Sequence, residues 1–250
     1  MALVKTYILR RSIKMRYCFS NLFLTALFFA FAISNTAQAD FIGQLVLEPE
    51  ECKEEGKCTL GEDFGYIDRS GLGWKADKGD ITDGASIPRF AQIFVGVPFE
   101  STALPAAVLH DHYSKSVRPV RGWFQTQRMF YEALLEGGVE EPRASMMYAG
   151  VLIGSGKWIT RMKGKECDVG DGIACMNQTV EVTLEIQPES YGTEKYLSSF
   201  EAIKAQIESG AVGRDAVENL ARIALPDDIY LNNPSGQIVE NVNVGIYATE

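Results

Sequence analysis

Proline and glycine divide the middle of the chain into three helical segments, and this division constrains the fold more than any other feature. In chain order, the helix-breaking residues are Pro105, Pro119, Gly122, Gly137, Gly138 and Pro142. Proline is tolerated in the first turn of a helix, and glycine is typical of the end of one. With Ser101 or Thr102 as the first cap, we predict helices to about Ser114, from Trp123 to Glu136, and from Pro142 through Ile159.

Short segments rich in Ile, Leu and Val precede these helices, and residues of this kind favour β-strands. They cover Phe41–Leu47, Phe64–Ile67 and Trp74–Ile81, whereas residues 49–62 have the composition of a loop. The sequence therefore predicts a small strand region before the helices.

The C-terminal part mixes both kinds of element. Val180–Ile186 alternates apolar and polar residues, which predicts a half-exposed strand, and Ile229–Leu231 is strand-like as well. Amphipathic helices are predicted over about 197–209 and 214–225. The fold class is accordingly α+β, with a central three-helix unit packed on short antiparallel strands and a C-terminal α/β extension.

The first 39 residues have the order of a secretory signal peptide. Lys14 and Arg16 precede an apolar run from about Leu22 to Ile33, and Ala37-Gln38-Ala39 has the small residues of a cleavage site. The run is short for a membrane span, which needs roughly 20 residues. We therefore expect an exported protein, periplasmic or extracellular, that starts at Asp40 and has no stable membrane span after cleavage of the leader.

The expected mature chain is strongly acidic. The leader holds five of the 24 Lys and Arg residues and none of the 33 acids, which leaves 19 basic and 33 acidic residues and a net charge of −14. Such a chain repels nucleic-acid phosphates, so a nucleic-acid partner is not expected. The sequence does not indicate which protein partners it has.

Four cysteines follow the leader, and an even number in an exported chain favours disulfides. Three pairings are open. We favour the local pairs Cys52–Cys58 and Cys167–Cys175, because each brackets a polar segment that contains glycine. A four-cysteine zinc site is disfavoured, because the spacings are looser than in most zinc sites.

The only two histidines lie in the sequence Leu109-His110-Asp111-His112, and a turn-forming run, Thr82–Arg89, precedes them. On the predicted helix Asp111 falls on the apolar stripe, and His110 lies about 100° around the axis. In one hypothesis His110 is a general base that Asp83 or Asp111 orients. In a second, these groups bind a divalent metal that activates water.

The alternative hypothesis is structural. A buried Asp111 would then bond backbone amides of the Thr82–Arg89 turn or pair with Arg89, Arg118 or Arg121, and His110 would be a satisfied side chain. Ser86 lacks the surroundings of a nucleophilic serine, so we expect it to cap or to satisfy the buried acid. Two histidines are too few for a three-histidine zinc site.

Residues 74–158 resemble a bacterial and phage family, domain of unknown function 1353. The matching stretches are Thr82–Pro88, Gly96-Val97-Pro98, Ala106–Asp111, Arg121, Phe130–Leu134, Gly138-Val139, Ala144 and Tyr148. The resemblance implies an acid in the second helix where this chain has Gln127, which lies on the inward stripe. An amide there keeps an oxygen but lacks the charge of a metal ligand.

These observations predict three parts: a signal peptide over 1–39, a main domain over 40–165, and an extension over 166–250. The leading hypothesis is a hydrolase-like site of Asp83, His110 and Asp111, supported by Ser86, Arg89, Arg121 and Gln127. Its substrate would be associated with the cell envelope. The alternative is a non-catalytic structural or binding module in which His-Asp ties the helix to the turn, so the sequence leaves open whether the protein is an enzyme.

Overall fold

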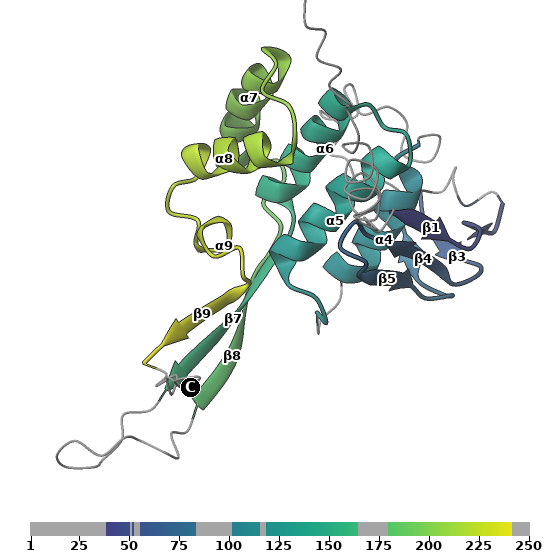
Figure 1. Ribbon diagram of the computed structural model, residues 1–250, viewed down its shortest axis with the longest axis horizontal. Coiled ribbons are helices and arrows are strands. Elements are labelled where there is room, and N and C mark those ends of the chain that lie inside the picture. Colours follow the sequence, from purple (N-terminus) through teal and green to yellow (C-terminus); the bar gives the residue numbers. More distant parts are fainter. Residues whose placement is uncertain are drawn as a thin grey trace, which may run out of the picture. The chain divides into compact units, whose positions relative to one another are not determined.

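The computed structural model describes residues 39–50, 52, 56–83, 102–115, 119–164 and 180–241 (Figure 1). The predicted leader, apart from Ala39, lies outside the described residues, and so does the predicted domain boundary at 165–166. The described elements are mixed α and β, with a C-terminal α/β region, as the sequence predicts. In the described part of the chain, no helix is long and apolar enough to cross a membrane.

Three central helices match the predicted segments closely. They are α4 (Leu104–Ser114), α5 (Trp123–Glu136) and α6 (Glu141–Gly154), and α5 contacts both of the others. The predicted cap of α4 is wrong: Ala103 occupies that position, without a side-chain cap. Glycine is required after α5, because a Cβ on Gly137 would lie 2.5 Å from the carbonyl oxygen of Thr102.

Two small antiparallel sheets precede the helices in the described residues. One has the order β1 (Asp40–Ile42), β4 (Phe64–Ile67), β5 (Gly73–Ala76), and the other has the order β2 (Leu47–Glu48), β3 (Cys58–Leu60), β6 (Ile81–Thr82). Thus β3 lies in a segment that we expected to be loop.

Two predicted strands are each split into two, because a glycine between the halves turns the backbone. Gly43, with φ of 85°, separates β1 from β2. Gly79, with φ of 93°, lies in the turn between β5 and β6. Few residues other than glycine adopt such angles. The disulfide Cys52–Cys58 confirms one predicted pair, while Cys167 and Cys175 lie outside the described residues.

Helix α4 docks on these strands through its last turn. The Tyr113 hydroxyl accepts a hydrogen bond from the backbone N–H of Lys75 at 2.9 Å, and its ring packs edge-on against Trp74. The Trp74 indole N–H in turn donates to the Asp68 carboxylate at 2.9 Å. These contacts fix the orientation of the helix that carries His110 and Asp111.

The predicted extension of the third helix through Ile159 is wrong. Helix α6 ends at Gly154, where a Cβ would lie 2.3 Å from the Tyr191 ring, and Ile159 belongs to strand β7 (Lys157–Gly164). Strand β7 pairs antiparallel with β8 (Val180–Gln187) and parallel with β9 (Gln237–Glu240).

Strand β8 is present as predicted, but it is not half-exposed. Its apolar side chains are open to solvent, with 62% of Val182, 43% of Leu184 and 59% of Ile186 exposed. The alternating pattern therefore identifies the strand correctly and misplaces its apolar face.

The C-terminal helices are α7 (Glu194–Glu208), α8 (Arg214–Ala224) and α9 (Ile229–Asn232). The first two were predicted within a few residues. The strand predicted at Ile229–Leu231 is instead the short α9, because the Asp228 carboxylate accepts hydrogen bonds from the amides of Tyr230 and Leu231 and so caps a helix.

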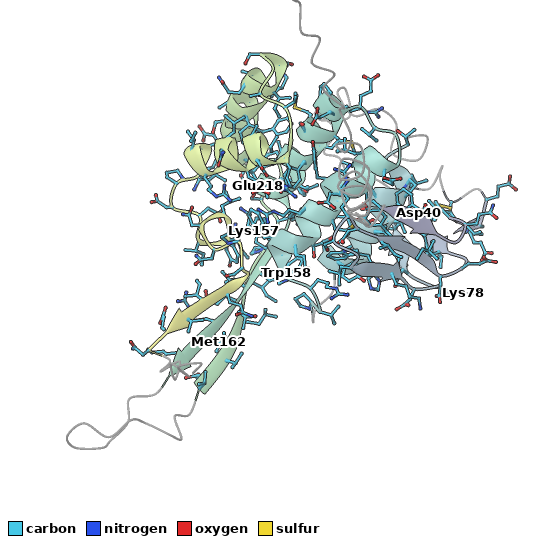
Figure 2. The ribbon with its side chains drawn as sticks, viewed as in Figure 1. Asp40, Lys78, Lys157, Trp158, Met162 and Glu218 are labelled. Atoms are coloured by element: carbon cyan, nitrogen blue, oxygen red, sulfur yellow. A yellow bond between two sulfur atoms is a disulfide. The ribbon has the colours of Figure 1, made fainter. Side chains whose placement is uncertain are left out.

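A buried carboxylate joins α8 to the central helices. Glu218, which is 3% exposed, accepts two hydrogen bonds from Arg128 on α5, at 2.8 and 2.9 Å, and one from the Tyr148 hydroxyl on α6, at 3.0 Å (Figure 2). Bidentate Arg–carboxylate pairs are strong and geometrically specific. The contact therefore holds the C-terminal helices in a defined register on the central unit.

Candidate functional site

Asp111 ties α4 to the end of β6. Its carboxylate is buried and accepts a hydrogen bond from the Thr82 hydroxyl at 2.7 Å. The Lys115 ammonium lies 3.1 Å from the same oxygen and donates to the Asp83 carboxylate at 2.7 Å. Lys115 thus bridges two acids that would otherwise repel one another, and it joins the start of the Thr82–Arg89 motif to the helix.

The His110 side chain contacts α5 and not the residues that surround Asp111. Its Nε2 atom lies 3.0 Å from the Gln127 side-chain oxygen on α5, and the Gln127 amide donates to the Ser155 hydroxyl at 3.3 Å. Because the amide NH₂ is directed at Ser155, the Gln127 oxygen faces the imidazole and accepts a hydrogen bond from the tautomer that carries its proton on Nε2. The Phe130 ring lies against the imidazole, with ring centroids 4.9 Å apart.

Burial favours the neutral form of both residues and so shifts their pKa values in opposite directions. Burial lowers the pKa of His110 to about 4, and the hydrogen bond to Gln127 reverses only part of this shift. Burial also raises the pKa of Asp111 to about 7, where Lys115 opposes the shift and Asp83 adds to it. At neutral pH His110 is therefore a neutral imidazole, which a buried site without a charged partner favours.

His112 forms a separate pair on the same helix. Its Nδ1 atom lies 2.6 Å from the Asp80 carboxylate, and 23% of its side chain is exposed. The two histidines of the chain therefore lie in contrasting surroundings, one covered and one accessible to water.

The structure brings only some of the predicted site residues together. Asp83 and Asp111 meet through Lys115, and His110 and Gln127 meet in a second cluster. Gln127 faces inward, as its position on the helix predicted. Arg121 lies elsewhere, where it donates to the Gly73 carbonyl at 3.1 Å and covers the Trp74 ring. Ser86 and Arg89 lie outside the described residues.

The sequence reasoning named neither Thr82 nor Lys115 as the partner of Asp111. Arg121 was proposed for that role and is engaged elsewhere. A signal was available for Lys115, since residues four apart on a helix are neighbours. Among the residues that the structure describes, no group of three or more His, Cys, Asp and Glu side chains could hold a metal ion. The metal hypothesis stays a prediction.

Two pockets in the described residues involve the C-terminal part, which the sequence did not single out. One, of about 300 Å³, includes Ile153, Lys157, Lys195 and Asp228 in its lining. The other, of about 550 Å³, lies where Arg121 on the segment before α5 faces Trp158 and the residues around Gly236. Pockets of this size suit small molecules.

Comparison with known proteins places the chain in a family. The model described as "Protein of unknown function (DUF1353)" matches residues 58–151. Uncharacterized protein y4iH of Sinorhizobium fredii (strain NBRC 101917 / NGR234) is 35% identical over 172 residues, which cover 68% of this chain and 70% of that protein.

A second protein of the same organism, uncharacterized protein y4jT, is 27% identical over 174 residues, which cover 66% of this chain and 51% of that relative. The match therefore spans about half the length of y4jT. No solved structure matches the chain significantly. The family match and the identity to y4iH confirm the predicted resemblance: the chain belongs to the DUF1353 family.

Proposed function

We propose that this protein is an exported, non-catalytic binding module in which His110 and Asp111 are structural ties. One observation carries the proposal: His110 bonds Gln127 inside the core, while the Asp83 carboxylate is held by Lys115. A general base works best when its pKa lies near the working pH, and burial takes the pKa of His110 to about 4.

The partner of His110 also favours a structural role. In catalytic histidine pairs a carboxylate orients the ring and stabilises the imidazolium that forms. Gln127 supplies an oxygen of the right geometry but no negative charge. The arrangement holds α4 against α5, and through Ser155 it reaches the segment that leads into β7.

Imidazole NMR tests the proposal, because the chain has only two histidines and a His112→Asn variant assigns the remaining signals. We expect the His110 ring to stay in the neutral form with the proton on Nε2 from pH 7.5 down to about 5. In a Gln127→Glu variant, a carboxylate would face the ring and the pKa of His110 should rise. A His110 imidazole that titrates near pH 6.5 in the unsubstituted protein would favour the hydrolase-like site of Asp83, His110 and Asp111.

Export is the second part of the proposal. Its support is the charged, apolar and small-residue order of residues 1–39 and the Cys52–Cys58 disulfide, since disulfides persist mainly in oxidising compartments. The test is the mass of the protein recovered from cell fractions after expression in a bacterium. A periplasmic product that begins at Asp40 is expected, and a full-length product in the cytoplasm would contradict export.

A further inference from the structure

The smaller pocket, of about 300 Å³, lies between the end of α6, the start of β7, the start of α7 and α9. Lys157, at the first position of β7, is labelled in Figure 2. Its side chain is 1% exposed and forms an ion pair with Asp228. Every residue that lines this pocket follows the family match, which ends at residue 151.

The buried ammonium of Lys157 has fewer acceptors than it would have in water. An ammonium has three N–H donors. The described residues give it one oxygen of Asp228 and the face of the Trp123 ring, 5.3 Å from Nζ. The other oxygen of Asp228 accepts the amides that cap α9. An oxygen atom in the pocket would therefore satisfy a buried donor, which lowers the cost of burying the charge.

Charges of both signs line the same pocket. Lys195, in the first turn of α7, adds a second ammonium, and Asp227 adds a second carboxylate beside Asp228. The four groups sum to zero, and the whole chain has a net charge of −9. A simple anion would meet a repulsive overall field, whereas a ligand with one charge of each sign can pair with both. The remaining wall is partly apolar, with Ile153, Leu225, Ile229 and Tyr230.

We propose that this pocket binds a small zwitterion, a free amino acid or dipeptide with an apolar side chain. The ligand carboxylate faces Lys157 and Lys195, and the ligand ammonium faces Asp227. The side chain lies against the apolar wall. This inference rests on the proposed function as a binding module and specifies its ligand class.

Calorimetric titration of the purified protein tests the inference with the free L-amino acids and the glycyl dipeptides as probes. At least one with an apolar side chain should bind with a Kd below about 10 mM. Its N-acetyl analogue lacks the ammonium, and its amide lacks the carboxylate, so each should bind at least about tenfold more weakly. Absence of binding by the whole panel, or equal affinity of the blocked analogues, would overturn the inference.

Variants of the charged lining residues test whether the ligand binds in this pocket. Lys195→Gln should weaken the zwitterion about tenfold and leave the amide analogue unchanged, because that analogue has no carboxylate to lose. Asp227→Asn should likewise weaken the zwitterion about tenfold, and it should leave the N-acetyl analogue unchanged, because that analogue has no ammonium to lose. Lys163→Gln and Asp215→Asn are matched controls on exposed residues outside the pocket lining, and they should have no effect.

Equal losses in the controls, or none in the pocket variants, would place the ligand elsewhere and refute the site. The result is independent of the imidazole spectra. A titrating His110 with intact zwitterion binding would refute only the structural role of the His-Asp pair. If His110 instead stays neutral down to about pH 5 and no zwitterion binds, only the proposed ligand site is refuted.

Discussion

Two adjacent residues of α4 should shift the stability of this protein with pH in opposite directions. His110 has a folded-state pKa of about 4, below its ordinary 6.5. Between these values the unfolded chain takes up a proton that the folded imidazole does not, so the free energy of unfolding falls as the pH decreases from 6.5 to 4. A shift of this size corresponds to about 3 kcal/mol.

Asp111 has the reverse linkage. Its folded-state pKa of about 7 exceeds its ordinary 3.8. Its contribution is therefore fully present below about pH 4 and is lost as the pH rises to 7, at a cost of about 4 kcal/mol. Over the window from pH 4 to 6.5 the two contributions cancel in the unsubstituted protein.

Single variants separate the two contributions. In Asp111→Asn the contribution of His110 remains, so the difference from the unsubstituted protein should become more favourable to folding as the pH rises toward 6.5. In His110→Gln the contribution of Asp111 remains, and the difference should become less favourable over the same range. Urea unfolding at several pH values between 4.5 and 7.5 measures both slopes.

The double variant provides the control, because it removes both groups and its profile should again run parallel to that of the unsubstituted protein between pH 4 and 6.5. Slopes of the same sign in the two single variants would refute the reasoning. A His110→Gln profile parallel to that of the unsubstituted protein would do so as well, because it would mean that the imidazole titrates as it does in the unfolded chain.

Three further predictions concern stability, and chemical denaturation checks each. Glu218→Gln should lower the free energy of unfolding by about 2 kcal/mol, because it removes the charge of the buried carboxylate that accepts two hydrogen bonds from the partly exposed Arg128. Cys52→Ser, which opens a short disulfide loop, should cost about 2 kcal/mol under oxidising conditions and nothing when both proteins are reduced. Asp68→Asn should cost about 2 kcal/mol at pH 7, because the carboxylate accepts the Trp74 indole N–H and other donors. Burial alone would raise the pKa of Asp68, but these hydrogen bonds lower it overall, so this cost should shrink as the pH falls through that lowered value.

The central helices could be predicted because their boundaries are local. Pro142 and the glycines after Glu136 act through their own backbone preferences, whatever packs against them. The C-terminal helices likewise follow from their amphipathic spacing. These signals need no knowledge of the tertiary structure.

The short strands and α9 could not be predicted in the same way. A strand of two or three residues, such as β2 or β6, exists only through its partner, and Gly43 signals a turn without fixing where pairing resumes. Ile229–Leu231 has the composition of a strand, but the preceding Asp228 caps it as a helix. The competition between composition and capping is decided by a single carboxylate.

The candidate site was predicted in part. Helical geometry alone separates His110 from Asp111, and the structure does direct them to different partners. The ion pair of Lys115 with Asp111 could also have been predicted, because residues four apart on a helix are neighbours. The contact to Gln127 joins two helices, so its distance depends on how they pack.

The pocket at Lys157 was beyond sequence reasoning, since its lining runs from Ile153 to Tyr230 and meets only after α6, β7 and α9 are packed. The family match ends at residue 151, so His110 and Asp111 lie within it and the proposed ligand groups lie after it. Substitutions such as Lys195→Gln can then change binding without disturbing the ties, and His110→Gln can lower stability without changing which ligand is bound.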